Sequence, residues 1–131
     1  ADAVICWLTG FPFAVNLSRG YPRYNPGEYS ANDLLERGEV DACLLVGSEP
    51  FRDLSPRAQS ALQQLPTIAL DYPNQSPPFA ATVQITTAIY GIHVAGTAYR
   101  MDEVPIPLRR LVSSELPTDD EVLREILHRL N

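Results

Sequence analysis

The sequence predicts an α/β fold: a Rossmann-like, mainly parallel sheet flanked by helices, with an extended edge segment and a C-terminal helix. Three short apolar runs, residues 3–8, 41–46 and 67–71, alternate with two helical patterns. Strands that alternate with helices favour parallel pairing through right-handed crossovers. The length of 131 residues is that of one domain, so we expect residues 1–131 to form a single α/β domain.

The first apolar run, residues 3–8, predicts a buried strand. About twenty residues rich in glycine, proline, tyrosine and asparagine follow, and they predict a long ordered loop. Five aromatic side chains argue against disorder and favour a contact surface there: Phe11, Phe13, Tyr21, Tyr24 and Tyr29. Cys6 and Cys43 lie in separate apolar runs without C-x-x-C spacing, so we expect both to be buried free thiols.

The first helical pattern follows this loop. Ser30 and Asp33 resemble a capping box, and Gly38 suits a C-terminal stop, so a short helix is expected between them. Residues 41–46 then form the second apolar strand.

The second helix starts at Ser55, because the next residue, Pro56, favours the first helical turn. Its apolar face has helical spacing and consists of Ala58, Ala61, Leu62 and Leu65. Pro66 ends the helix, and residues 67–71 form the third strand.

The last third of the chain predicts one more strand at residues 82–88 and extended chain at 97–108. Pro105 and Pro107 place the extended chain at a sheet edge, because proline cannot donate to a ladder.

The chain ends in a predicted helix over residues 116–131. Thr118 and Glu121 form a capping box at its start. Helical spacing predicts one buried stripe: Val122, Leu123, Ile126, Leu127 and Leu130.

Polar residues follow two of the predicted strands at the edge where open α/β sheets bind ligands. The strand at residues 41–46 is followed directly by Gly47, Ser48 and Glu49. These residues predict either a ligand-binding edge or a tight strand-to-helix turn. Asp71 ends the third strand, where its carboxylate would accept hydrogen bonds from a ribose or guanine, or would start the following turn.

Composition excludes several function classes. The net charge is −6 and all ten basic residues are arginine, so we expect no nucleic-acid partner and no lysine chemistry. No apolar run reaches the roughly 18 residues of a membrane span, and residues 1–8 lack signal-peptide features, so we expect no membrane segment and a cytoplasmic location. His93 and His128 lack companion ligands, and no serine stands in G-x-S-x-G, so we expect neither a metal ligand nor a catalytic residue.

One stretch identifies a family. The run GTAYRMD at residues 96–102, within residues 81–108, resembles the B subunit of formylmethanofuran dehydrogenase, a member of the molybdopterin oxidoreductases. Residues 9–15, 18–28 and 37–42 match the same family in order, so the resemblance covers nearly the whole chain.

The resemblance implies one α/β lobe of a larger subunit, or a reduced relative, that works in one-carbon metabolism with the other subunits of its complex. In redox relatives this region holds a molybdopterin guanine dinucleotide with molybdenum or tungsten. The B subunit of the formyltransferase/hydrolase complex has lost that redox equipment. Redox catalysis also needs a cysteine or selenocysteine metal ligand and an iron-sulfur cluster from elsewhere. We therefore expect a non-catalytic scaffold in which this chain lacks the cofactor, or a partial pterin-dinucleotide-binding lobe that retains it.

By this resemblance, seven positions fall where relatives contact the cofactor: Gly47, Ser48, Glu49, Asp71, Gly96, Thr97 and Arg100. The Arg100 guanidinium suits a phosphate, although an ion pair with Asp102 or Glu103 is the alternative. Many relatives carry Asn at the position of Glu49, and the dehydrogenases tend to have Gly at Glu103; an added carboxylate repels a pyrophosphate. A self-standing nucleotide-binding module, the other function considered, would need a G-x-G-x-x-G fingerprint after the first strand, and residues 9–12 lack it.

Overall fold

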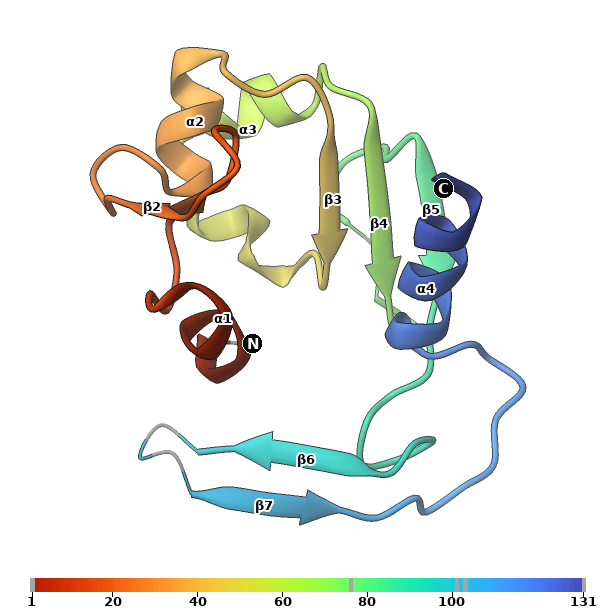
Figure 1. Ribbon diagram of the computed structural model, residues 1–131. Coiled ribbons are helices and arrows are strands. Elements are labelled where there is room, and N and C mark those ends of the chain that lie inside the picture. Colours follow the sequence, from red (N-terminus) through yellow and green to blue (C-terminus); the bar gives the residue numbers. More distant parts are fainter. Residues whose placement is uncertain (1, 76, 101, 103, 131) are drawn as a thin grey trace. The chain divides into compact units, whose positions relative to one another are not determined.

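The computed structural model shows a mixed α/β protein (Figure 1) and describes residues 2–75, 77–100, 102 and 104–130. The helices are α1 (Asp2–Thr9), α2 (Ala31–Arg37), η1 (Glu49–Asp53, a 3-10 helix), α3 (Pro56–Leu62) and α4 (Asp119–Leu130). The strands are β1 (Val15–Asn16), β2 (Arg23–Tyr24), β3 (Cys43–Val46), β4 (Thr67–Asp71), β5 (Val83–Thr86), β6 (Gly96–Tyr99) and β7 (Pro105–Leu108). The predicted α/β class, with parallel strands between helices and a C-terminal helix, is confirmed.

The chain groups into two compact units. One comprises Ala1–Cys43 with Pro50–Pro66, and the other comprises Leu44–Glu49 with Thr67–Asn131. Because the units interleave along the chain, neither is a separately connected domain, and the single domain over residues 1–131 stays a prediction.

In the first unit, α2 and α3 contact each other, and both begin where the sequence predicts. α3 ends at Leu62, before the predicted stop at Pro66, so Leu65 lies outside the helix. The Ser30 side chain accepts a hydrogen bond from the Asp33 amide at the start of α2, and Gly38 closes the helix in the left-handed conformation (φ 67°). The side chain of Ser55 caps α3 by accepting from the Ala58 amide, with Pro56 next to it. Ser55 also joins the two helices, since its amide donates to Asn32 Oδ1 at 2.8 Å.

The prediction of a buried strand at residues 3–8 is wrong, because these residues lie in α1. Gly10, with a positive φ of 81°, closes the helix through a bond from its amide to the Cys6 carbonyl at 2.8 Å. A continuous apolar run fits a helix as well as a strand, since it has no period. Cys6 is exposed rather than buried, and Trp7 and Leu8 are 75% and 79% exposed.

The loop that follows is ordered, as predicted. β1 and β2 pair in antiparallel fashion within it. The rings of Phe11 and Tyr24 stack with centroids 4.8 Å apart, and the Arg23 guanidinium lies 4.9 Å from the Tyr29 ring centroid. These contacts stabilise a segment that has little regular secondary structure.

The second unit contains the sheet of order β3-β4-β5. β4 pairs in parallel with β5, with Ile68 opposite Val83, and its residues Ala69 and Leu70 are buried. β3 is only partly buried, since Leu44 and Val46 are about half exposed. Cys43 is half-buried, and this burial raises the pKa of its thiol.

Helix α4 begins at the predicted capping box, in which the Thr118 amide donates to Glu121 and the Glu121 amide donates to Thr118 Oγ1. The predicted buried stripe is wrong, because no α4 residue is buried and Leu130 is 78% exposed. Within the described ranges, no helix is both long and apolar enough to cross a bilayer.

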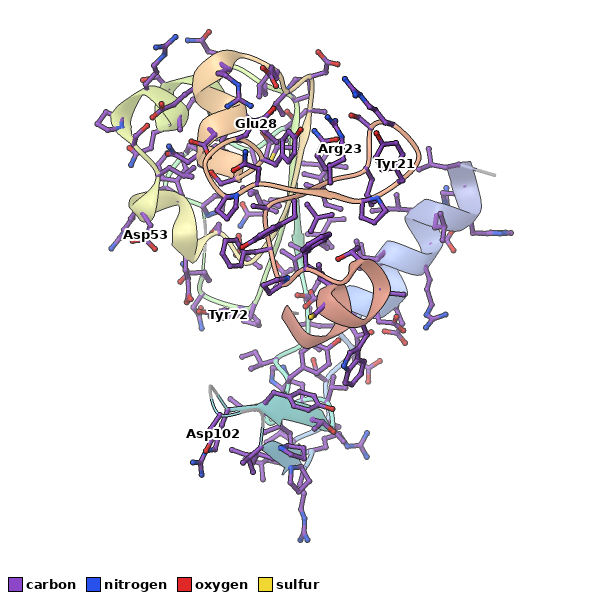
Figure 2. All side chains as sticks on the ribbon, turned by 60° about the vertical axis from the view of Figure 1, so that its left-hand side comes forward. Tyr21, Arg23, Glu28, Asp53, Tyr72 and Asp102 are labelled. Carbon is purple, nitrogen blue, oxygen red and sulfur yellow. The ribbon has the colours of Figure 1, made fainter. Side chains whose placement is uncertain are left out.

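The predicted extended segment forms an antiparallel hairpin of β6 and β7, a two-stranded sheet of its own. Figure 2 shows Asp102 at the turn end of this hairpin.

We predict that Ser55→Ala lowers the free energy of unfolding by about 1 kcal/mol, because α3 loses its N-cap. Ser60→Ala, an exposed position inside the same helix, is the matched control and should change the free energy by less than about 0.5 kcal/mol. Urea unfolding measures both. Equal effects of the two substitutions would contradict the capping role of Ser55.

Candidate functional site

The carboxyl ends of β3 and β4 meet at a turn that depends on Gly47. This glycine has a φ of 81°, a conformation that costs other residues about 1–2 kcal/mol. Its amide donates to the Leu70 carbonyl at 2.8 Å, which extends the pairing of β3 with β4 by one residue. The chain then turns into η1, so the predicted strand-to-helix turn is present.

A buried hydrogen bond joins the two strand ends. The Ser48 amide donates to Asp71 Oδ1 at 2.8 Å, and the two residues are 1% and 2% exposed. Two further polar atoms of this pair, Ser48 Oγ and Asp71 Oδ2, are buried and have no hydrogen-bond partner among the described residues. A buried carboxylate oxygen without a hydrogen-bond partner lowers the stability of the fold. The pair therefore forms one buried hydrogen bond and leaves two polar atoms that could bond to another group.

Glu49 contacts the residue after Asp71. The Tyr72 hydroxyl donates to Glu49 Oε1 in a short hydrogen bond. This bond, with some burial and the negative charge of Glu49, raises the pKa of Tyr72. Gly47, Ser48, Glu49 and Asp71 therefore lie together at one sheet edge.

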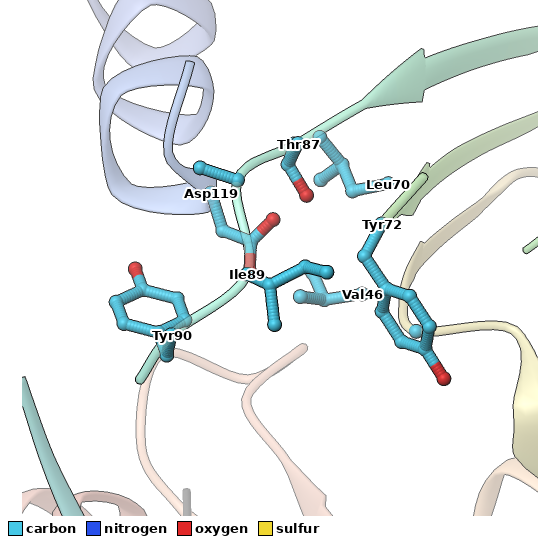
Figure 3. A pocket seen from close by; sticks show the side chains of 9 residues that line it. Val46, Leu70, Tyr72, Thr87, Ile89, Tyr90 and Asp119 are labelled. Atoms are coloured by element: carbon cyan, nitrogen blue, oxygen red, sulfur yellow. The ribbon is translucent and has the colours of Figure 1, made fainter. Parts of the chain in front are cut away.

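A pocket of about 300 Å³ opens at the same edge (Figure 3). The lining residues come from the strand ends, from the segment after β5 and from the start of α4: Val46, Gly47, Leu70, Tyr72, Thr87, Ala88, Ile89, Tyr90 and Asp119. Figure 3 shows Tyr90 and Asp119 on one side of the pocket and Tyr72 on the other. Burial and the negative charge of Asp119 raise the pKa of Tyr90.

Asp71 does not line this pocket. Its neighbours Leu70 and Tyr72 do, and successive residues of a strand face opposite sides of the sheet. The carboxylate is thus directed to the other face, where it holds Ser48. The sequence pattern singles out Asp71 but not the pocket residues Tyr72, Tyr90 and Asp119. Two of them lie near a signal that the sequence contains, since Tyr72 follows Asp71 and Asp119 is in the first turn of a predicted helix.

The other three predicted site residues belong to the hairpin. Gly96 starts β6 beside the Tyr90 ring, where a Cβ atom would lie 3.3 Å from a ring carbon. Thr97 is exposed in β6. Arg100 makes a bidentate ion pair with Asp102, with N–O distances of 3.0 and 2.5 Å. The ion pair that the sequence offered as the alternative to a phosphate contact is therefore present. Glu103 lies outside the described residues.

The pocket suits an uncharged ring better than a pyrophosphate. Its described lining is apolar and aromatic with one carboxylate, Asp119, and none of these residues is cationic. Asp119 Oδ1 is buried without a hydrogen-bond partner in the described part of the chain. A group with hydrogen-bond donors fits here, whereas a pyrophosphate would meet negative charge.

Neither histidine joins a cluster. His93 Nδ1 accepts from the Ile89 amide at 3.2 Å and so supports the turn that precedes β6. Among the described residues, no three His, Cys, Asp or Glu side chains lie close enough to hold a metal ion.

Comparison with known proteins identifies relatives over the whole chain, although no family model matches it. The chain is 44% identical to the B subunit of the tungsten-containing formylmethanofuran dehydrogenase 2 of Methanocaldococcus jannaschii, over 98% of this chain and 30% of that protein. The protein of the same name from Methanococcus maripaludis is 37% identical, over 99% of this chain and 30% of that protein.

A solved structure has the same fold. It is the formyltransferase/hydrolase complex from Methylorubrum extorquens in complex with methylofuran, which matches with a TM-score of 0.80 and 28% identity over 99% of this chain and 36% of that chain. The chain spans about 30% of the length of the curated relatives it matches.

We predict that Asp71→Ala lowers the free energy of unfolding by about 1–3 kcal/mol, because the Ser48 amide then stays buried without an acceptor. Asp71→Asn retains an acceptor oxygen at Oδ1, so it should lower the free energy of unfolding clearly less than Asp71→Ala does. Asp41→Ala, at an exposed position, controls for loss of a carboxylate. If Asp71→Ala and Asp41→Ala unfold at the same urea concentration, the bond does not stabilise the fold.

The Tyr72 phenol should keep its proton to a higher pH than an ordinary tyrosine, since its pKa is raised by Glu49. Glu49→Gln removes the negative charge that disfavours the phenolate, so the pKa of Tyr72 should fall towards its usual value. NMR titration of labelled tyrosine rings measures this, with Glu28→Gln as the control. An unchanged Tyr72 titration in Glu49→Gln would show that the hydrogen bond is not formed in solution.

Proposed function

We propose that these residues form a structural lobe of a protein like the B subunit of formylmethanofuran dehydrogenase. The chain is related over nearly its whole length to part of that subunit. The relatives are named for formylmethanofuran dehydrogenation and for formyl transfer and hydrolysis. The lobe accordingly belongs to a multi-subunit complex that processes formyl groups in one-carbon metabolism. Its role there is to hold other parts of the complex in place, while the chemistry takes place elsewhere.

The observation that carries this proposal is the exposure of large apolar side chains in each of the two units. Four large side chains are each about three quarters exposed: Trp7, Leu8, Leu111 and Leu130. Single exposed apolar residues are ordinary, but Trp7 and Leu8 are neighbours on α1, and α4 has an apolar stripe with no buried member. Apolar helix faces of this kind are typical of protein interfaces.

A second candidate function is to hold part of a molybdopterin guanine dinucleotide that carries tungsten or molybdenum. The 44% identity with a protein named as tungsten-containing favours it. The pocket at the carboxyl edge would receive an uncharged ring, with Tyr72 and Tyr90 beside it. The pyrophosphate fits poorly, because the Arg100 fork is already paired with Asp102.

The metal content of the native assembly distinguishes the two candidate functions. Elemental mass spectrometry of the natively isolated assembly should find about one tungsten or molybdenum per chain if the lobe helps to hold the cofactor. An intact assembly without either metal would contradict the second candidate and leave the structural lobe.

The structural role predicts that other subunits co-purify with the protein that contains this chain, and that Trp7→Ala weakens the association. A buried interface tryptophan contributes about 2 kcal/mol or more, so the dissociation constant should rise roughly 30-fold or more. Trp7 is 75% exposed within the chain, so the stability of the lobe itself should change little.

Arg57→Ala, an exposed polar position on α3, is the control and should leave the association intact. Quantitative mass spectrometry of the purified assemblies measures both variants. Isolation of the native protein as a single polypeptide would contradict the proposal.

A further inference from the structure

The hairpin of β6 and β7 has two outer edges that differ in hydrogen-bonding capacity. The register pairs Ala98 with Ile106 and Tyr99 with Pro105. The Arg100 amide donates to the Val104 carbonyl at 3.1 Å, which fixes the phase of the ladder. In an antiparallel pair the bonded residues alternate, so Ala98 and Arg100 direct their backbone groups to β7, while Thr97 and Tyr99 direct theirs outward.

Prolines occupy the matching outward positions of β7. Pro107 lies opposite Thr97, and Pro105 lies opposite Tyr99. A proline has no backbone N–H, so this edge offers carbonyl oxygens without donors. Prolines at such positions block the addition of another strand.

The outer edge of β6 has no such block. Thr97 and Tyr99 each present an N–H and a C=O there, and both residues are exposed. In the described part of the chain, no backbone hydrogen bond from outside the hairpin reaches either residue. An unpaired strand edge is a template for a further strand.

We propose that the outer edge of β6 pairs with a β-strand from the same polypeptide, supplied by a segment outside these 131 residues. This inference rests on the proposed function, in which the chain is one lobe of a longer subunit. The chain spans about 30% of its curated relatives, so the remainder of such a protein is long enough to supply the strand. A strand on the same polypeptide also has a high effective concentration at this edge.

The chemistry of the hairpin indicates what kind of strand fits. On β6 itself Tyr99 is 51% exposed, and the charge of Arg100 is balanced by Asp102. An uncharged strand that places an apolar side chain beside Tyr99 therefore suits this edge. A second copy of this chain fits less well, because each copy carries a net charge of −6.

Amide hydrogen exchange in the full-length protein tests the pairing residue by residue. The amides of Ala98 and Arg100 are internal standards, because they are bonded within the hairpin in either case. With a strand on β6, the Thr97 and Tyr99 amides exchange within about tenfold of these standards. A free edge would leave Thr97 and Tyr99 exchanging at least roughly 100-fold faster than Ala98, and this result would overturn the proposal.

A pair of variants tests the same edge. Tyr99→Pro removes one outward donor, as Pro105 does on β7, and Thr97 should then exchange roughly tenfold faster or more. Tyr99→Ala keeps the donor and should leave Thr97 protected. Protection of Ala98 in both variants shows that the hairpin is intact, and equal Thr97 exchange in the two variants would contradict strand pairing.

Other occupants give distinct results. Protection of Thr97 that is lost on dilution would show pairing with a second copy, and protection lost only when other subunits are removed would show a partner's strand; either result overturns the assignment to the same polypeptide. If no other subunit co-purifies but Thr97 and Tyr99 are protected in the longer chain, the proposed assembly role fails while the strand pairing stands.

Discussion

The hydrogen bond from the Ser48 amide to Asp71 Oδ1 is the contact on which the arrangement of the sheet edge depends. It joins the ends of β3 and β4 after the last pairing bond, from Gly47 to Leu70. With Asp71 held on one face, Leu70 and Tyr72 face the other and line the pocket. The same bond directs the chain after Gly47 into η1, where Glu49 reaches the Tyr72 hydroxyl.

Local signals in the sequence are sufficient for the elements that end at specific side chains. Ser30, Ser55 and Thr118 are predicted helix starts, and each accepts the expected amide hydrogen bond. Gly38 closes α2 in a conformation that glycine adopts readily. These features involve residues within three or four positions of one another, so a sequence pattern contains all the partners. The carboxyl edge is also predictable, because polar residues follow two apolar strands there.

Burial is predicted less well, for a physical reason. An apolar pattern predicts that a face is covered, but it does not say by which segment. Leu130 of α4 and Trp7 of α1 remain exposed although the apolar pattern of each helix predicts that they are covered. The orientation of Asp71 and the pairing of Arg100 with Asp102 depend on strand phase and turn geometry, which single residues do not specify. The pocket residue Tyr90 escapes prediction because its position depends on the turn closed by His93.

The hydrogen bond that joins Ser48 and Asp71 across the strand ends can be measured directly by NMR. A scalar coupling across the hydrogen bond, between the Ser48 amide nitrogen and the Asp71 carboxyl carbon, reports the bond itself. We expect a detectable coupling together with slow exchange of the Ser48 amide, since the pair is buried. Absence of the coupling with rapid exchange of that amide would contradict the account, because the sheet edge, the turn and the pocket would then lack their common support.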